Sequence, residues 1–411
     1  MLATQSPSSS RRTRLGEFAA LVMAINAGAR SFLLVLGVLI SFHYLSSFTL
    51  EFGRTSMSNI MTYFQQYPAS SDDATFSGDE ITIVVPSMEP DDDAYIAPTA
   101  NAAFVILARN SDIDATVKSI RDIEDHFNRR YQYPYVFLSE AELSEGFKWR
   151  TSNVASTPVE FGVIPHDHWY QPHWIDEAKA AAARRKMVDD YVIHGGSVSY
   201  RNMCRFNSGF FYRQPLLQKY RWYWRIEPGA HFPCNINFDP FLYMETHNKT
   251  YGFTMTLYEF EPTIHTLWGH VKDFIKLHPE YLAKDNSMGY ISDTGGETYN
   301  RCHFWGGFEI ADLAFWRGDA YQAYFDYLDK RGGFYYERWG DAPVHSIGAA
   351  LFASRDQIHF FDEIGYERSP YTHCPRNRET WAAGQCACNP AHNFDYDGYS
   401  CMKQWERIQH E

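Results

Sequence analysis

The sequence predicts an α/β protein in which helices cover the faces of a β-sheet and one N-terminal segment crosses a membrane. A strand, a helix and a second strand follow one another within residues 102–139, and residues 32–50 carry no formal charge. Hydrophobic residues make up 45% and charged residues 21% of the 411 positions, which is ordinary globular usage and excludes wholesale disorder. The formal net charge of −13 argues against non-specific binding to nucleic acid, so we expect no nucleic-acid partner.

The N-terminus predicts a single-pass membrane anchor. At about 1.5 Å per residue, a helix over residues 32–50 spans about 28 Å, close to the thickness of a bilayer's hydrocarbon core. Arginines precede this run, so the positive-inside rule leaves residues 1–31 in the cytosol and the rest of the chain in the lumen, a type II topology. A cleaved signal peptide is the alternative, although the run starts later and is longer than a usual signal sequence. The arginines are Arg11, Arg12, Arg14 and Arg30.

Residues 51–98 are interpreted as a stem. They are rich in Ser, Asp, Pro and Ala and have few periodic hydrophobic positions. The acidic run at residues 91–93 is therefore interpreted as a solvated linker and not as a metal site. Residues 99–411 follow without a flexible linker or a tandem repeat, which predicts one large lumenal catalytic domain.

The folded part opens with a predicted βαβ unit. Residues 102–110 form a hydrophobic run typical of a buried strand, hydrophobic positions over 113–127 recur at helical spacing, and 133–139 form a second strand. Two strands joined by a crossover helix are parallel and carry helices on their faces. Ligands bind such sheets at the carboxyl ends of the strands, so Arg109 and Asp112 are candidate substrate-binding residues.

The rest of the domain continues with strands and helices. Residues 222–226, with the sequence WYWRI, are expected to form a strand that ends at the pair Glu227-Pro228. Another strand is expected over residues 251–260. Helices are expected over residues 174–194, 274–282 and 313–330.

Seven cysteines, all in the expected lumenal domain, predict disulfide bonds because the secretory lumen is oxidising. A zinc site is the alternative for the four cysteines nearest the C-terminus, but their C-x-C spacing is unlike the usual C-x₂-C pairs of zinc sites. Seven is odd, so one thiol is free or pairs outside the chain. The cysteines are Cys204, Cys234, Cys302, Cys374, Cys386, Cys388 and Cys401, of which the last four are the candidate zinc ligands.

Common catalytic motifs do not occur: the sequence has no Gly-rich dinucleotide fingerprint, P-loop, nucleophile elbow or H-E-x-x-H. Candidate chemistry therefore rests on single carboxylates. Glu227, at the end of its strand, can hold a divalent cation that bridges a diphosphate, or it can pair with Arg225; the residues alone leave both open. The Asp-x-Asp spellings at 112–114 and 395–397 match a metal motif but are interpreted as solvated loop or cap residues.

Two further blocks hold candidate residues. Glu309 follows two glycines in HFWGGFEIA, at the start of a segment expected to become helical, and the neighbouring aromatic side chains should exclude water. Such a carboxylate suits attack on, or stabilisation of, an oxocarbenium-like centre, and helix capping is the alternative. The block ERWGDAPVHS contains Asp341 and His345, for which a buried ion-pair cluster and a catalytic cluster are both open.

These blocks resemble the fungal α-1,2-mannosyltransferases of glycosyltransferase family fifteen, the killer-toxin-resistance type. The resemblance covers roughly residues 100–375 in unbroken order and rests on stretches such as FGVIPHDHWYQPHWID, YRNMCRFNSGFFYRQPLL, YWRIEP, CHFWGGFEIADLAFWR and GGFYYERWGDAPVHSIGAALF. It implies a glycosyltransferase fold of the A type, a Rossmann-like mixed sheet with flanking helices. It also implies a type II protein of the Golgi membrane with its catalytic domain in the lumen.

The resemblance further implies an activity and site residues. The reaction would transfer mannose from GDP-mannose to the 2-hydroxyl of an α-mannoside on N- or O-linked glycans, with retention of configuration and Mn²⁺ as cofactor. By the matching motifs, Glu309 falls on the family's proposed nucleophile and Tyr200 on a tyrosine thought to contact the reacting sugars. Glu227 falls on the metal-side carboxylate.

One position departs from the family pattern. The stretch IGYERSPY has Arg368 where the family commonly has a histidine associated with the metal, and an arginine offers no lone pair to a cation. Either His345 or water completes the metal shell, or Arg368 binds the diphosphate directly; Asp341 is a further substrate-binding candidate. The alternative function is a catalytically weak or inactive, glycan-binding paralogue, and a glycosidase with Glu227 and Glu309 as its carboxylate pair ranks last.

Overall fold

The computed structural model describes residues 99–410. The expected cytosolic tail (1–31), anchor (32–50) and stem (51–98) lie outside the described residues. Within the part that is described, no helix combines the length and the hydrophobic character needed to cross a bilayer. The fold below is that of the expected lumenal domain.

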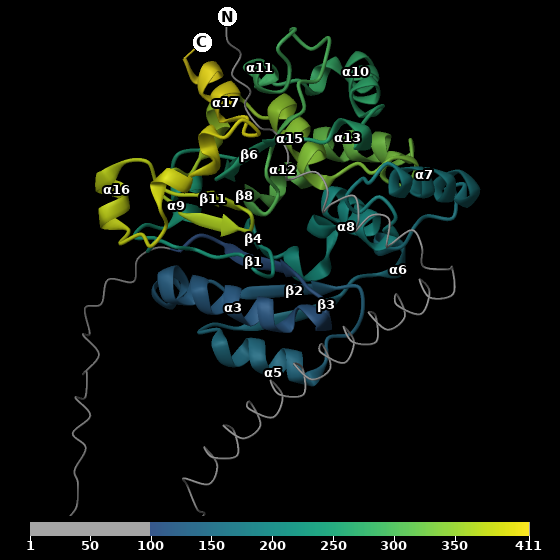
Figure 1. The fold of residues 1–411 in the computed structure, drawn as a ribbon. Helices are drawn as coiled ribbons and strands as arrows, with labels where there is room; N and C mark the ends of the chain where they lie inside the picture. The colour runs from purple at the N-terminus through teal and green to yellow at the C-terminus, as the bar shows by residue number, and fades with distance from the viewer. Residues whose placement is uncertain (1–98, 411) are drawn as a thin grey trace, which may run out of the picture. The chain divides into compact units, whose positions relative to one another are not determined.

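A seven-stranded mixed sheet forms the centre of this domain (Figure 1). Its strands are β1 (Ala102–Leu107), β2 (Tyr135–Ser139), β3 (Val159–Val163), β4 (Trp222–Ile226), β5 (Tyr251–Phe253), β8 (Phe308–Asp312) and β9 (Ile358–Phe360). They lie in the order β3-β2-β1-β4-β8-β5-β9. The strands from β3 to β4 are parallel, whereas β8 is antiparallel to both β4 and β5. The predicted parallel βαβ unit and the mixed sheet are thereby confirmed.

Helices pack on both faces of the sheet (Figure 1). One face carries α3 (Ile113–Ile123) and α5 (Glu145–Val154), and the other carries α8 (Val198–Gly209), α12 (Leu313–Arg317), α13 (Asp319–Asp329) and α15 (Asp341–Phe352). Successive side chains of a strand point to opposite faces. In β1, Ala103 and Val105 accordingly join the core beneath α8 and α15, whereas Phe104 and Ile106 join the core beneath α3.

Shorter elements complete the domain. Two pairs of antiparallel strands stand outside the main sheet: β6 (Thr256–Tyr258) with β7 (Cys302–Phe304), and β10 (Tyr366–Arg368) with β11 (Tyr371–His373). The remaining α-helices are α4 (Arg129–Tyr131), α6 (His166–Trp169), α7 (Glu177–Asp189), α9 (Pro240–Thr246), α10 (Leu267–Leu277), α11 (Met288–Ile291), α14 (Gly333–Tyr336), α16 (Arg378–Ala383) and α17 (Met402–Gln409).

Three expected elements differ from the observed ones. The strand expected over 251–260 is two short strands, because its first half pairs with β8 in the main sheet and its second half with β7 outside it. The helix expected over 313–330 is divided by Gly318, whose extended backbone separates α12 from α13. The helix expected over 274–282 begins earlier, at Leu267, and ends at Leu277, before Pro279.

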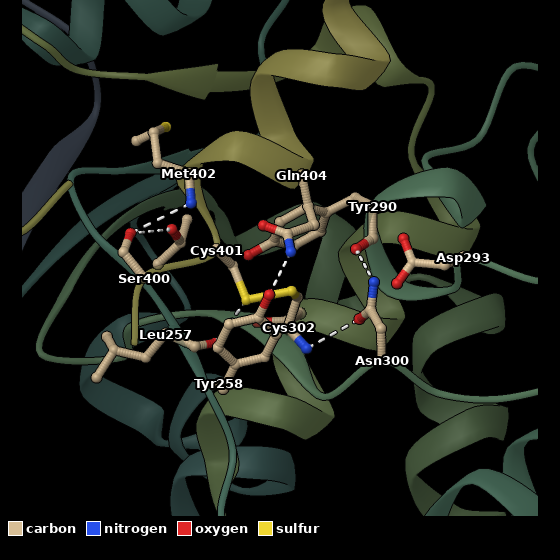
Figure 2. The surroundings of a disulfide bond; sticks show 12 residues. Leu257, Tyr258, Tyr290, Asp293, Asn300, Cys302, Ser400, Cys401, Met402 and Gln404 are labelled. Carbon is tan, nitrogen blue, oxygen red and sulfur yellow. Dashed lines mark hydrogen bonds between the residues drawn. A yellow bond between two sulfur atoms is a disulfide. The ribbon is translucent and has the colours of Figure 1, made fainter. Parts of the chain in front are cut away.

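Six of the seven cysteines form disulfides, as the lumenal assignment predicted. Because the four C-terminal cysteines are all paired, the zinc alternative is wrong. The remaining Cys204 is buried in α8, so it does not pair outside the chain. The Cys302–Cys401 bond joins β7 to the residue before α17 (Figure 2). The bonds are Cys234–Cys386, Cys302–Cys401 and Cys374–Cys388.

Candidate active site

A cleft of about 600 Å³ lies at the carboxyl ends of β1 and β4, where the sheet topology predicts a ligand. Segments far apart in the sequence form its walls: the end of β1, the start of α3, α8, the end of β4, the link between β7 and β8, the start of α15, and β10. Its polar and aromatic lining residues include Asp112, His194, Tyr200, Arg225, Glu227, Trp305, Asp341 and Arg368. We refer to this hollow as the cleft.

Glu227 faces the cleft between two guanidinium groups. The Nη2 atom of Arg225 donates to Oε1 of Glu227 at 2.8 Å, and Nε of Arg368 lies 3.8 Å from Oε2. The Glu227 side chain is 29% exposed, so a carboxylate oxygen remains within reach of a ligand. Gly229 has φ +88°, and a Cβ there would lie 3.3 Å from Arg368, so a glycine suits this close approach. Glu227 therefore lines the cleft and also forms the ion pair with Arg225, so the two interpretations left open by the sequence do not exclude each other.

Arg225 also pairs with Asp341, at the first position of α15. Its Nη1 atom donates to Oδ2 of Asp341 at 2.5 Å. Burial alone would raise the pKa of Asp341, but the positive charge and the hydrogen bond of Arg225 outweigh it and lower that pKa below its usual value. Asp341 therefore lines the cleft as an ionised group that holds Arg225, so the substrate-binding role predicted for it is indirect in this structure.

Glu309 is the second residue of β8, opposite Arg225 of β4, and not at the start of a helix as expected. Glu309 is 1% exposed and does not line the cleft. It lines instead a separate chamber of about 20 Å³ that shares Leu107 and Arg225 with the cleft. Such a volume suits about one water molecule. Glu309 therefore does not face the cleft in this structure, because its position in a central strand buries the side chain; its role toward the reacting sugar stays a prediction.

Hydrogen bonds fix the Glu309 carboxylate from three directions. The hydroxyl of Tyr223 donates to Oε1, the hydroxyl of Tyr251 donates to Oε2 at 3.0 Å, and Nδ1 of His345 lies 2.9 Å from Oε2. Burial raises the pKa of Glu309, and the neighbouring His345 only partly opposes this. The group is thus a buried hydrogen-bonded cluster, which we call the Glu309 cluster.

His345, the other predicted metal ligand, has both ring nitrogens engaged in this structure, and its metal role stays a prediction. Its Nδ1 is engaged by Glu309, and its Nε2 lies 2.9 Å from the carbonyl oxygen of Asn207. His345 lies one helical turn beyond Asp341 on α15, which places it in the core beneath the cleft. With both ring nitrogens hydrogen-bonded, it offers no lone pair to a cation beside Glu227.

Tyr200 lines the cleft from the first turn of α8. Its ring stacks on His194, with the ring centres 4.3 Å apart, and the guanidinium of Arg338 lies 5.2 Å from the ring centre. Arg109, by contrast, does not line the cleft. It pairs with Glu140 at 2.9 Å and donates to the hydroxyl of Ser199 at 2.5 Å, so it supports the start of α8.

The two Asp-x-Asp spellings have different surroundings. Asp112 lines the cleft, while Asp114 is exposed and pairs with Arg150 at 2.7 Å. Asp395, expected to be solvated, is 1% exposed and lies 3.1 Å from Nδ1 of His373. The expectation fails at Asp395 because its carboxylate is buried against the ring of His373 in β11.

Residues that sequence reasoning missed complete the cleft wall. Trp305 and Gly306 precede Glu309 in the HFWGGFEIA block and line the cleft, although Glu309 itself does not. His194 supports the Tyr200 ring. The aromatic and glycine residues of that block were a usable signal, whereas nothing in the sequence distinguished His194 from a surface histidine.

The fold and the cleft define a class: a mixed α/β glycosyltransferase fold with a central sheet and flanking helices. Solved structures of this fold are similar to the chain. Core-mannan synthase A (CmsA/Ktr4) from Aspergillus fumigatus, in a Mn/GDP form, is 37% identical with a TM-score of 0.71, over 77% of this chain and 87% of that one. The mannosyltransferase Ktr4p from S. cerevisiae in complex with GDP is 39% identical with a TM-score of 0.72, over 75% and 82%.

The chain belongs to the glycolipid 2-alpha-mannosyltransferase family, whose sequence profile matches residues 60–410. Glycolipid 2-alpha-mannosyltransferase 2 of Candida albicans is 53% identical over 74% of this chain, and the match spans 66% of that protein's length, just under two thirds. Alpha-1,2 mannosyltransferase KTR1 of Saccharomyces cerevisiae is 48% identical over 76% of this chain and 80% of that protein. The resemblance to fungal α-1,2-mannosyltransferases is confirmed.

Proposed function

We propose that the protein transfers mannose from GDP-mannose to the 2-hydroxyl of an α-mannoside, with retention of configuration. The observation that carries this proposal is the cleft at the strand ends, where Glu227 stands between Arg225 and Arg368. A diphosphate carries negative charge, and arginines bind phosphate oxygens through paired, charge-assisted hydrogen bonds. Solved relatives with this fold contain GDP, which supports the same donor here.

We propose Mn²⁺ as the cofactor, with Glu227 as the protein ligand. Within residues 99–410, neither of the clusters of three potential metal-ligand residues includes Glu227, so the other ligands would be phosphate oxygens and water. Carboxylate, phosphate and water oxygens suit Mn²⁺, so the residues fit the ion. When bound, the ion supplies Lewis-acid stabilisation of negative charge on the departing GDP.

The chain's own residues divide the remaining work. Asp341 holds Arg225 at the cleft, and Arg225 and Arg368 bind the diphosphate and counter the negative charge that develops on it. Tyr200 contacts the reacting sugars as the catalytic side chain. Glu309 acts through others: with His345 and Tyr223 it supports the floor beneath Arg225, which makes it a positioning residue.

The direct test uses the purified full-length chain in detergent with GDP-mannose, methyl α-mannoside and Mn²⁺. We expect a disaccharide whose new bond is cut by an α-1,2-specific mannosidase and whose anomeric configuration, read by NMR, is α. Release of GDP without a disaccharide, or no reaction at all with Mn²⁺ present, would reject the proposal.

We further propose that the protein is a single-pass type II protein of the Golgi membrane, anchored by residues 32–50 and with its catalytic domain in the lumen. The uncharged run behind a basic N-terminus supports the topology, and three disulfides suit an oxidising lumen. Protease treatment of sealed Golgi vesicles tests it: residues 99–411 should be protected until detergent is added. Digestion in intact vesicles would contradict it.

The other candidate functions gain no support. Nothing in the cleft or among the named relatives favours an inactive, glycan-binding paralogue. The glycosidase alternative required Glu227 and Glu309 to flank a substrate, but Glu309 is buried outside the cleft.

A further inference from the structure

A second hollow, which we call the aromatic groove, lies outside the cleft and has a volume of about 450 Å³. This volume falls within the usual range for small-ligand pockets, about 300–1,000 Å³. The groove residues on which the inference rests are Tyr258, Glu259, Phe260, Glu261, Arg301 and Tyr399. None of these six residues lines the cleft.

Three segments far apart in the sequence form this groove, and the Cys302–Cys401 disulfide joins two of them; Figure 2 shows this disulfide and Tyr258. Tyr258 ends β6, and its amide donates to the carbonyl of Tyr399, two residues before Cys401, at 3.2 Å. The amide of Glu259 donates to the carbonyl of Arg301, next to Cys302, at 2.8 Å. The disulfide therefore holds the Tyr399 segment against the Arg301 segment, and the two backbone hydrogen bonds attach both to the wall formed by residues 258–261.

The groove has the chemistry of a sugar-binding surface. Phe260 and Tyr399 are 47% and 42% exposed, so their rings present flat apolar surface to solvent, as the C–H face of a hexose requires. Oε1 of the half-exposed Glu261 carboxylate lies 2.6 Å from Nδ1 of His265, and its other oxygen can accept hydrogen bonds from sugar hydroxyls. In the described part of the chain, the Arg301 guanidinium forms no ion pair or hydrogen bond and is free to donate to the same ligand.

The groove adjoins the cleft through one layer of side chains. Oε1 of Glu259 lies 3.6 Å from Nη2 of Arg338, and the Arg338 guanidinium lies over the ring of Tyr200 in the cleft. The Glu259 carboxylate also abuts Gly340, the residue before Asp341. Arg338 is buried, so its side chain forms the partition between the two hollows, and a ligand that extends past Tyr200 over this partition reaches Glu259 and the aromatic rings.

From this adjacency we infer that the aromatic groove is a distal acceptor subsite, which binds the mannose units behind the terminal unit that receives the new mannose. The inference rests on the proposed function, because it assigns the groove to the acceptor of that reaction. It predicts that the enzyme prefers α-mannooligosaccharides to a single mannoside and that Phe260 and Tyr399 create this preference.

The test compares acceptors of increasing length with the full-length chain in detergent: methyl α-mannoside, then α-linked mannobiose, mannotriose and mannotetraose. We expect kcat/KM to rise with length for the wild type, through a lower KM. Phe260→Ala and Tyr399→Ala should each lower kcat/KM for the longer acceptors by about tenfold and leave kcat/KM for methyl α-mannoside unchanged. Tyr399→Phe keeps the ring and should keep most of the gain.

Trp149→Ala is the matched control, since Trp149 is an aromatic residue of α5, 68% exposed and outside both hollows. It should leave every acceptor unaffected. If the wild type shows no dependence on acceptor length, or if the groove variants lower all acceptors by one factor, the subsite does not exist. If the wild type transfers mannose to none of the acceptors, the proposed function itself fails, and binding of mannotetraose to the wild type and to Tyr399→Ala, measured by calorimetry, still decides whether the groove binds mannosides.

Discussion

Glu227 and Glu309 belong to neighbouring strands of one sheet, yet they have opposite environments. Glu227 follows the end of β4, where the chain enters the cleft, and two arginines face it. Glu309 sits inside β8 and is surrounded by two tyrosines and a histidine. The surroundings of a carboxylate thus decide whether it can reach a ligand: Glu227 lies beyond the end of β4 and lines the cleft, whereas Glu309, paired with Arg225 inside the sheet, lines the buried chamber.

The largest effect should come from Glu309→Ala, and it should be on stability. The change leaves the Tyr223 and Tyr251 hydroxyls and the His345 ring without their shared partner in a buried site, so we expect the free energy of unfolding to fall by about 3–5 kcal/mol. Urea unfolding followed by tryptophan fluorescence measures this. Glu309→Gln keeps the volume and should cost less; equal stability of Glu309→Ala and the wild type would show that the cluster does not support the fold.

Glu227→Gln should have the reverse pattern, with a large loss of turnover and little loss of stability. Arg225 keeps its bond to Asp341, so the fold survives, whereas the charge that faces the diphosphate is gone. We expect kcat to fall by about 10²–10³-fold, as for the loss of one electrostatic contact in an active site. The thermal unfolding midpoint should remain unchanged.

Glu140→Gln is the matched control for that variant. Glu140 pairs with Arg109 at 2.9 Å and is 25% exposed, close to the values for Glu227, but it lies outside the cleft. Its loss should leave kcat within about twofold, because an exposed ion pair contributes little. Equal effects of the two variants would mean that the cleft gives Glu227 no special role.

Arg368→Ala separates two roles for the guanidinium opposite Glu227. The Nε atom of Arg368 has no hydrogen-bond partner within residues 99–410, so it is free to donate to a phosphate. Loss of one charge-assisted hydrogen bond should weaken GDP binding about tenfold or more, measured by calorimetry with and without Mn²⁺. Arg109→Ala serves as the control outside the cleft. A tighter complex only when Mn²⁺ is present would instead show that Arg368 competes with the ion for Glu227.

Much of the fold could be predicted from the sequence because it is a matter of local periodicity. The hydrophobic runs of β1 and β2, the helical spacing of α3, and the proline after Glu227 each specify their element within a few residues. The location of the cleft followed, since parallel strands present their carboxyl ends on one edge.

The placement of Glu309 could not be predicted in this way. A five-residue segment such as FEIAD does not distinguish a buried strand from the first turn of a helix. The partners of Glu309 come from β4, β5 and α15, which are far apart in the sequence. The ion pair of the cleft is equally non-local, since Arg225 and Asp341 are separated by 116 residues. Disulfide pairing is equally non-local, since six cysteines allow fifteen patterns.

The smallest expected effect is on how the free energy of unfolding depends on pH, and it has opposite signs for Glu309 and Asp341. Burial raises the pKa of Glu309 in the folded protein, against the opposing charge of His345 and with Asp341 adding to the rise. The protonated form is therefore the one that the fold favours. The contribution of Glu309 to stability is fully present below the pKa of an unfolded glutamate, about 4.3, and is lost as the pH rises through the raised value.

Asp341 has the opposite sign: its lowered pKa adds stability above the pKa of an unfolded aspartate, which is lost in acid. Glu309→Gln cannot titrate, so the stability of the wild type relative to this variant should decline as the pH is raised from 4.5 toward 7. A flat difference across that range would mean that the Glu309 carboxylate is ionised in the core, held by His345 as an ion pair, and that the two carboxylates differ in exposure but not in charge.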